Sequence, residues 1–427
     1  MFVSFLKHLL LSWWVMAQNN GKLKNISSDL QMERPLRILM IAPQPWFSPR
    51  GTPFSVLHRI KALSLLGHRI DLATYPIGQD IEIPGLKIHR SAGIPGVKKV
   101  KIGPSKTKIW LDLGLWRKSI QLLEQNKYDL LHTHEEAAFW GVNLSEKFYV
   151  PHLYDMHSSL PQQLSNFKYT KSRFITGIFD RLEERSILSA SAVITICPEL
   201  QAFVEKRFPD TKSILIENVA DNSLVFPPQQ ANQKALVKRF DIEHKQIVLY
   251  YGTLETYQGI ELLLEAATHL PDSRKQTLRF LIAGGSEEQV KSYQKKAKDL
   301  NVSNQFIFTG FVQPQEIPSL IDLADVLVSP RLKGNNSPLK IYSYLRSQKP
   351  IVATDHVTHT QILNPSVSEL TAITPQAFAR GILRVLEEPE YAQELARKAA
   401  RLAEKQYSYE DYLNKTKWVV QQAVRNN

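Results

Sequence analysis

Residues 329–354 of the chain, SPRLKGNNSPLKIYSYLRSQKPIVAT, decide the fold. Their pattern predicts a short apolar strand ending at Val328, a basic polar loop, a helix from about Pro338 to Arg346 and a second strand, IVAT. A polar loop directly ahead of a helix can bind an anion, because unpaired backbone N–H groups and the helix dipole point at the ligand. The alternative is an ordinary capped helix between two strands.

The loop and the first helical turn also carry suitable side chains. Ser337 could cap the helix and Pro338 could start it. Lys340, one turn into the helix, adds a mobile positive charge. The candidate anion-binding residues of the loop itself are Arg331, Lys333, Gly334, Asn335, Asn336 and Ser337.

Length and composition indicate a globular protein of two domains. The 427 residues exceed what one core usually organises, and 43% hydrophobic with 22% charged residues argues against wholesale disorder. The net charge of +12 favours anionic partners such as phosphate groups, membrane lipids or nucleic acid. Nucleic acid is argued against, because no zinc-ligand spacing, RNP-like run or helix-turn-helix signature accompanies the charge. The single cysteine, Cys197, fits a reducing compartment.

The N-terminal segment, MFVSFLKHLLLSWWVMAQNN, allows three interpretations. Lys7 and His8 interrupt it, so the apolar remainder is too short to span a bilayer. It could form an interfacial helix that anchors the chain to a membrane, with two tryptophans at headgroup depth. It could be a secretion signal, although no convincing cleavage site is present. It could also be untranslated, with Met32 as the physical start.

The rest of the chain alternates apolar strands with helices. Residues 37–43, RILMIAP, read as a strand buried on both faces, and a helix over residues 54–66 and the strand RIDLATY complete a βαβ unit. Ligands of such sheets sit beyond the carboxyl ends of the strands. Gly51 and Thr52, in the first loop, are therefore candidates for a binding cleft, although a plain turn is the alternative.

Two further strands deliver histidines to their carboxyl ends. YDLLHTHEEAAFWG brings His132 and His134 next to Glu135, and VPHLYDMHSSLP brings His157 near Asp155. These residues could carry acid–base work or bind sugar hydroxyls, although a lone histidine is more often structural. Metal binding is disfavoured, since no third and fourth ligands appear at helical or CxxC-like spacing.

Residues 97–108, VKKVKIGPSKTK, contain five lysines and no acid. A solvated face is the usual interpretation of such a charge run. The functional alternative is a patch for anionic lipid headgroups, in which each lysine near the membrane contributes about 1 kcal/mol.

Composition and pattern divide the chain. A stretch rich in proline, glutamine and asparagine marks a linker, after which strand and helix patterns restart with QIVLYYGTL. Two doubly wound halves in tandem predict one deep cleft that the carboxyl ends of both sheets face. The predicted divisions are a leader over 1–34, an N-terminal domain over 35–216, a linker over 217–245, a C-terminal domain over 246–395 and helices over 396–427 that pack back toward the N-terminal domain.

The order of these segments resembles the family 4 glycosyltransferases. The resemblance covers about residues 35–420 and rests on RILMIAP with its loop glycine, HTHEEAA, DMHSS, ITICPEL, IENVADN, YYGTLETYQGIELLLEA, FTGFVQPQEIPSLIDLADVLVSP and SPLKIYSYLRSQKPIVAT. It implies an α/β fold of the GT-B type, with two Rossmann-like parallel-sheet domains facing a cleft. It also implies transfer of a sugar from a nucleotide diphosphate donor, with retention and generally without a metal. The donor would lie against the C-terminal domain and the acceptor against the N-terminal one.

The resemblance is uneven at the residues that matter for the donor. The family normally has two glutamates eight positions apart, and these positions hold Asn335 and Ser343 here. The arginine and lysine that usually hold the diphosphate fall at Thr253 and Gln258. The two glutamate positions thus lack the carboxylate, which puts the identity of the donor in doubt. The other two positions lack the cation, so the charge of a diphosphate must be met by other groups. The replacements available for the diphosphate are Arg331, Lys333, Lys340 and the backbone N–H groups around Asn336 and Ser337.

Other matches assign roles to the remaining candidates. His157 matches the family's cleft histidine, and Gly51 and Thr52 match the loop beside the phosphates. The expected catalytic residues are His157, His134 and Asn335, and Glu135 and Ser158 are expected on the acceptor side. The expected donor and phosphate residues are Gly51, Thr52, Gly252, Thr253, Gln258, Arg331, Lys333, Asn336, Ser337, Lys340 and Ser343.

The resemblance thus implies a retaining glycosyltransferase that uses a UDP- or GDP-linked sugar, no cofactor and no metal. The acceptor would be lipid-linked, a glycan or a small molecule, as in cell-envelope polysaccharide synthesis. The expected location is the cytoplasm, peripheral at the inner face of the membrane if an anionic lipid surface is a partner. The alternative is a catalytically inactive GT-B protein that binds a nucleotide or a glycan. An epimerase of the same fold is a minor option, because it would need carboxylates around the nucleotide sugar and residues 329–354 supply none.

Overall fold

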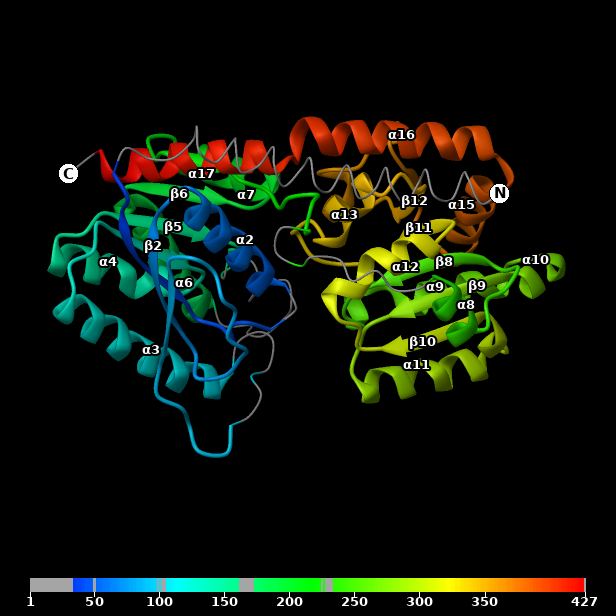
Figure 1. Ribbon diagram of the computed structural model, residues 1–427, viewed down its shortest axis with the longest axis horizontal. Helices are drawn as coiled ribbons and strands as arrows, with labels where there is room; N and C mark the ends of the chain where they lie inside the picture. The colour runs from blue at the N-terminus through cyan, green and yellow to red at the C-terminus, as the bar shows by residue number, and fades with distance from the viewer. Residues whose placement is uncertain are drawn as a thin grey trace.

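The computed structural model describes residues 34–48, 51–97, 100, 105–159, 161, 173–223, 226 and 233–425. Two parallel β-sheets, each covered by helices on both faces, lie side by side (Figure 1). This arrangement confirms the predicted class, an α/β protein with two doubly wound halves. The predictions for the leader and for much of the lysine run 97–108 fall outside the described residues.

The N-terminal half is built on one parallel sheet. The described strands pair in the order β3-β2-β1-β4-β5-β6-β7, so the chain reverses direction across the sheet between β1 and β4. The strands are β1 (Arg37–Ala42), β2 (Arg69–Thr74), β3 (Leu86–Arg90), β4 (Leu130–His134), β5 (His152–Met156), β6 (Ala192–Thr195) and β7 (Ser213–Leu215). The helices are α2 (Thr52–Leu65), α3 (Lys106–Gln125), α4 (Ala137–Phe148), α6 (Arg173–Ser189) and α7 (Pro198–Arg207).

The C-terminal half repeats this topology with the strand order β10-β9-β8-β11-β12-β13. Its strands are β8 (Gln246–Tyr251), β9 (Leu278–Ala283), β10 (Phe306–Gly310), β11 (Val326–Ser329), β12 (Ile351–Thr354) and β13 (Glu369–Thr371). Its helices are α8 (Gln233–Phe240), α9 (Ile260–Thr268), α10 (Asp272–Thr277), α11 (Glu287–Asp299), α12 (Ile317–Leu323), α13 (Lys340–Arg346), α14 (Val357–Thr360), α15 (Pro375–Glu387) and α16 (Pro389–Gln406), with α17 (Tyr409–Val424) following.

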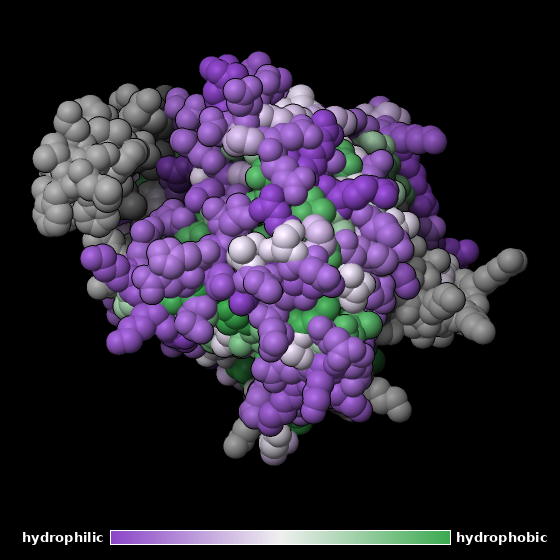
Figure 2. All heavy atoms as spheres, turned by 90° about the vertical axis from the view of Figure 1, so that its right-hand side faces the viewer, coloured by the Kyte–Doolittle hydropathy of each residue, from purple (hydrophilic) through white to green (hydrophobic). Residues whose placement is uncertain are grey.

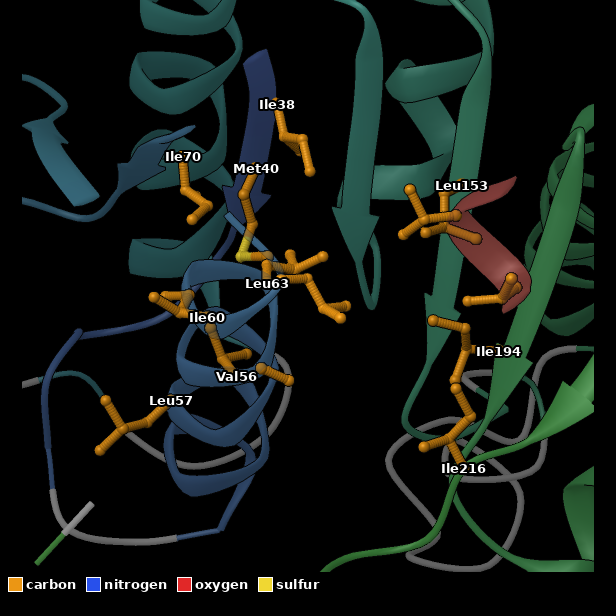
Figure 3. Packing of buried hydrophobic residues seen from close by; sticks show 14 of the residues in the cluster. Ile38, Met40, Val56, Leu57, Ile60, Leu63, Ile70, Leu153, Ile194 and Ile216 are labelled. Atoms are coloured by element: carbon orange, nitrogen blue, oxygen red, sulfur yellow. The ribbon is translucent and has the colours of Figure 1, made fainter. Parts of the chain in front are cut away.

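Alternate residues of each central strand serve two separate cores. In β1, Ile38 and Met40 belong to the core that α2 covers, and Figure 3 shows Met40 pointing toward Leu63 of that helix. Leu39, between them in the sequence, packs on the opposite side with α3 and α4. A strand buried on both faces explains why RILMIAP is continuously apolar rather than alternating.

The last two helices cross from one half to the other. Helix α16 contacts α13 and α15 of the C-terminal half, whereas α17 packs against α2, β5 and β6 of the N-terminal half (Figure 1). The first crossing, which begins after β7, lies beside this second one, because the Ala220 N–H donates to the Tyr407 carbonyl at 3.1 Å. The hydroxyl of Tyr342, on α13, also donates to the carboxylate of Glu217 at 3.2 Å.

The surface of the C-terminal half differs from these cores. At the end turned to the viewer in Figure 2, hydrophilic side chains predominate and hydrophobic ones show only in small separate patches. Among the described residues, no helix has the length and apolarity that crossing a membrane requires.

Helix α17 contributes to the N-terminal core through Leu413, which is fully buried there. We expect Leu413→Ala to lower the free energy of unfolding by about 2–5 kcal/mol, since it removes buried methyl groups and leaves a cavity. Urea unfolding followed by circular dichroism measures the change. Asn414→Ala, an exposed neighbour on the same helix, is the matched control. An equal effect of the two substitutions would contradict the assignment of α17 to this core.

Candidate active site

Polar contacts join the two halves where their sheets end. Asn336, in the loop after β11, donates from its side-chain amide to the carbonyl of His157 at 2.7 Å. His157 directly follows β5. The predicted loop and the predicted cleft histidine therefore meet, although they lie 179 positions apart.

The neighbouring Asn335 is held by a closed ring of hydrogen bonds. Its amide donates to Glu199, in the first turn of α7, at 2.6 Å. The Gln361 side chain donates to the Asn335 carbonyl at 2.6 Å and accepts from the Glu199 N–H at 3.0 Å. Asn335 thus links the halves and carries no charge into the site.

The helix after this loop starts later than predicted. Helix α13 begins at Lys340 instead of Pro338, and its N-terminal cap residue, Leu339, has helical backbone angles and no side-chain cap bond. Pro338 belongs to a preceding turn, in which its carbonyl accepts from the Ile341 N–H at 3.0 Å. Ser337 does not cap the helix, and its buried hydroxyl has no hydrogen-bond partner among the described residues. The prediction of a cap at Ser337 is therefore wrong, and charged side chains rather than a helix dipole dominate this loop.

The loop rests closely on the first turn of the C-terminal half. The Leu332 N–H donates to the Tyr257 carbonyl at 2.9 Å. Gly259 has a φ of +77°, and a Cβ there would meet the Pro330 carbonyl oxygen at 1.9 Å. Only glycine allows this approach. On the same side of the loop, Lys340 lies beside Gly252, where its Nζ would be 3.2 Å from a Cβ built at that glycine.

Lys340 is a buried cation without an acidic partner. Its side chain is 6% exposed, and its Nζ lies 3.7 Å from the centre of the Tyr250 ring. It donates to Gln258 Oε1 at 3.4 Å, and no carboxylate of the described residues makes an ion pair with it. Burial, and then the nearby charge of Arg331, lower the pKa of Lys340 well below its ordinary value. An anion beside the two cations would reverse both effects.

Arg331, like Lys340, has no acidic partner among the described residues, whereas Lys333 is exposed to solvent. The Arg331 guanidinium lies 5.2 Å from the Tyr257 ring centre and donates from Nε to the Lys333 carbonyl at 2.9 Å. Within the described chain no carboxylate pairs with it, and burial lowers its pKa. Lys333 is exposed. Of the predicted phosphate-binding cations, Arg331 and Lys340 are therefore the two that are at least partly buried and that no described carboxylate neutralises.

The uncharged donor-side candidates lie in two places. Gln258 reaches Lys340, and the Thr253 carbonyl accepts from the Tyr250 hydroxyl at 2.6 Å, so both border the two cations. Ser343 lies on α13 and accepts from the Asn222 amide at 2.9 Å. Its hydroxyl is thus engaged by the segment that follows β7.

On the N-terminal side, the first loop and the end of β4 come together. The Thr52 hydroxyl donates to Glu135 at 2.9 Å. Gly51 is exposed with a φ of +44°, and a Cβ there would meet nothing within 4 Å. Ser158 follows His157 and is partly buried. The predicted acceptor-side residues therefore lie at the carboxyl edge of this sheet.

His157 belongs to a buried cluster of polar side chains that also contains His134, Asp155 and Arg59. His134 Nδ1 and His157 Nε2 are 2.9 Å apart, and His157 Nε2 lies 3.4 Å from Asp155. Asp155 accepts from Arg59 Nε at 3.0 Å. Arg59 in turn donates to the Thr416 hydroxyl on α17 at 3.0 Å.

Burial sets the protonation of this cluster. It lowers the pKa of His134 well below the ordinary value, so this ring is neutral at pH 7. Burial alone would raise the pKa of Asp155, but Arg59 and then the neighbouring histidines hold it well below its usual range. The cluster therefore contains one ionised pair, Arg59 and Asp155, and neutral imidazole that can donate or accept a hydrogen bond.

Ligand atoms of His132, His134 and Asp155 lie within 4.8 Å of one another, a grouping that could hold a metal ion. The sequence prediction against a metal rested on local spacing and did not anticipate this grouping. Arg59 already neutralises Asp155, and a dication there would lie beside a buried guanidinium. We therefore assign no metal to the cluster.

Sequence reasoning missed three residues that shape the site. Arg59 is one arginine within a helical pattern, and Glu199 and Gln361 belong to different domains. Their roles follow from neighbours that only the tertiary fold supplies, so no local signal marked them. The apolar strand pattern did predict which loops share an edge.

Comparisons with known proteins agree with this architecture. The sequence profile described as Glycosyltransferase Family 4 matches residues 49–224, and that described as Glycosyl transferases group 1 matches residues 232–402. The alpha-D-kanosaminyltransferase of Streptomyces kanamyceticus is 24% identical over 64% of this chain and 70% of its own. An uncharacterized glycosyltransferase of Methanocaldococcus jannaschii is 23% identical over 82% and 88%.

Solved structures show the same fold. Sucrose-phosphate synthase from Thermosynechococcus elongatus superposes with a TM-score of 0.75 at 18% identity, covering 92% of this chain and all of that one. Anabaena HepE in complex with UDP and glucose gives 0.70 at 17%, covering 90% and 99%. These similarities confirm the expected GT-B arrangement.

We expect Arg59→Gln to lower the free energy of unfolding by about 3–5 kcal/mol at pH 7, because Asp155 is then a buried carboxylate without its ion-pair partner. The folded-state pKa of Asp155 is depressed, so its stabilisation is present above pH ~4 and is lost as the pH falls further. The difference between wild type and variant should therefore shrink on acidification.

Chemical denaturation between pH 7 and pH 3.5 measures this difference, with the exposed Arg69→Gln as control. A penalty that is independent of pH would contradict an ionised Asp155.

Proposed function

Because this chain belongs to the family 4 and group 1 glycosyltransferases, it transfers glycosyl groups, and we propose that it takes them from a nucleotide diphosphate sugar bound at the loop of residues 329–337. The observation that carries the proposal is the pair of cations at Lys340 and Arg331. Lys340 is buried and Arg331 is partly buried, and neither has a carboxylate partner among the described residues. Two adjacent buried charges of the same sign are costly unless an anion lies between them.

A diphosphate would satisfy the groups around these cations. Arg331 can grip two phosphate oxygens at once, and Lys340 offers a point charge. The unpartnered hydroxyl of Ser337 supplies a further donor. Thr253 and Gln258 lack the usual cations of the family, and this set takes over their task.

The chemistry needs no carboxylate nucleophile. In a retaining transfer on one face, the bond between the anomeric carbon and the diphosphate oxygen breaks. A bond to the acceptor oxygen then forms on the same face, and the departing diphosphate takes the acceptor's proton. Stabilising the leaving diphosphate is then the largest catalytic contribution, and positioning is the next.

Hydrogen-bonding groups at the edge of the N-terminal sheet suit the positioning of hydroxyls. His157, held by His134 and by the Asn336 contact, can bind hydroxyls of the donor sugar or of the acceptor. Asn335 stands where the family has a glutamate near the donor sugar. Thr52 and Glu135 would receive an acceptor, which we propose is a glycan, a lipid-linked glycan precursor or a small hydroxylated molecule.

Among the nucleotides, we favour UDP and propose that no metal is required. Anabaena HepE, a structural neighbour, is known in complex with UDP-glucose. The cationic pair supplies the charge that a metal would otherwise bring to the diphosphate. The alternative is a catalytically inactive chain that binds a nucleotide or a glycan. The missing charges at Thr253 and Gln258 would favour it if Arg331 and Lys340 bound no diphosphate.

We expect Lys340→Met and Arg331→Ala each to weaken binding of the nucleotide diphosphate by about 1–3 kcal/mol, as the loss of a charge-assisted hydrogen bond would. Lys340→Met should also leave the free protein as stable as wild type or more stable, because it removes an unpaired buried cation. Isothermal titration calorimetry and thermal unfolding measure these two quantities. The matched control is Lys333→Ala, which changes an exposed lysine. Unchanged nucleotide affinity in both Lys340→Met and Arg331→Ala would contradict the proposed phosphate site.

A thermal-shift screen with UDP, GDP, ADP and their sugars tests the donor, with and without magnesium. A ligand at 100 times its dissociation constant stabilises the fold by about 2.7 kcal/mol. We expect a shift with UDP and a UDP-sugar in the absence of magnesium. Hydrolysis or transfer of the sugar that shifts the protein would separate an enzyme from an inactive binder. A shift only with magnesium would contradict the metal-free proposal.

A further inference from the structure

One helix of the N-terminal half carries large apolar side chains into solvent. On α3, Ile109 is 68% exposed, Trp110 66% and Trp116 36%. The helix is anchored by its other face, through Leu111 and Leu115, which are fully buried. The exposed residues do not take part in that core.

The exposed residues form a stripe. Ile109 and Trp116 are seven positions apart, with Leu113 between them, so the three lie along one side of the helix. Trp110 borders the stripe, and Leu113 is partly buried. The stripe occupies the first three turns of α3, and we call it the α3 stripe.

Charge around the stripe has one sign. Residues 105–118, which the structure describes, contain four basic residues and one acid, Asp112. That acid is not available to a partner, because it accepts from the hydroxyl of Tyr75 in the interior. Arg117 is exposed next to Trp116. An apolar stripe with an exposed arginine beside it complements a surface that is apolar inside and anionic at its rim.

We propose that the α3 stripe docks this protein on the surface of an anionic lipid bilayer. Tryptophan prefers the headgroup region of a membrane, and an amphipathic helix with lysine and arginine beside Trp, Ile and Leu lies in that interface. Nearby basic residues add electrostatic attraction to anionic lipids. A second copy of this chain fits the stripe less well, because two basic surfaces would then face each other.

The position of the stripe relates it to the acceptor side. Helix α3 follows β3 and precedes β4, so its first turns lie at the carboxyl edge of the sheet. Lys108 forms an ion pair with Glu136, whose neighbour Glu135 contacts Thr52. A membrane against the stripe would thus lie beside the acceptor-side residues. That a lipid-linked acceptor reaches them from the membrane rests on the proposed function.

The test uses the full-length chain and vesicle sedimentation. Vesicles of phosphatidylcholine alone are compared with vesicles that also contain phosphatidylglycerol, at subsaturating lipid so that partition coefficients are obtained. The variant is Trp110→Ala with Trp116→Ala. The control is Trp418→Ala, which removes a tryptophan that is 43% exposed on α17. Thermal unfolding verifies that each variant is folded.

We expect the wild type to partition to the anionic vesicles and the double variant to partition about tenfold less, while the control stays close to wild type. Raising the salt concentration should weaken binding of the wild type. Equal partitioning of the double variant and the control would overturn the proposal, as would no binding of the wild type. A wild-type dimer that the double variant dissociates would also overturn it and assign the stripe to a second copy.

Donor binding is measured on the same preparations. Since the α3 stripe lies apart from Arg331 and Lys340, both variants should retain wild-type nucleotide affinity. A chain that binds vesicles and no nucleotide would remove the donor proposal and leave the membrane proposal standing.

Discussion

The buried ion pair between Arg59 and Asp155 ties together three elements that are distant in the sequence. Arg59 comes from α2, Asp155 from β5, and Thr416 of α17 accepts from the same guanidinium. A carboxylate at this depth is tolerable only with its partner, so the three elements must be assembled for either charge to be buried. The rings of His134 and His157 pack beside this pair, at 3.7 Å and 3.4 Å from the Asp155 carboxylate. The cleft histidine therefore depends on a helix from the very end of the chain.

The two sides of the cleft treat charge in opposite ways. On the N-terminal side a cation and a carboxylate neutralise each other in the interior, and imidazole and hydroxyl groups lie at the edge with Glu135. On the C-terminal side, Lys340 and Arg331 lie close together without a carboxylate among the described residues. Neutral hydrogen-bonding groups suit sugar hydroxyls, and unneutralised cations suit phosphate. The asymmetry matches the division between acceptor and donor that we propose.

Sequence patterns sufficed for the fold and for part of the site. Apolar strands such as residues 37–42 and 351–354 are recognisable because both of their faces are buried. Once the strands are known, the parallel topology brings His134 and His157 to one edge, and these predictions needed no further information. The start of α13 was mispredicted because a serine–proline pair also suits a turn. Arg59 and Glu199 escaped notice because their partners are set by tertiary packing, which local patterns do not contain.

The paired crossings between the halves govern how the cleft can open. The chain passes from the N-terminal to the C-terminal half after β7 and returns between α16 and α17, and the Ala220 to Tyr407 hydrogen bond holds both passages side by side. Because the two connections are adjacent, we expect any relative movement of the halves to be a rotation about that line rather than a twist or a slide. The hydrogen bond from Asn336 to the His157 carbonyl then holds the two halves together on the side away from these connections. Breaking a few hydrogen bonds on that side admits a bulky ligand while both cores stay intact.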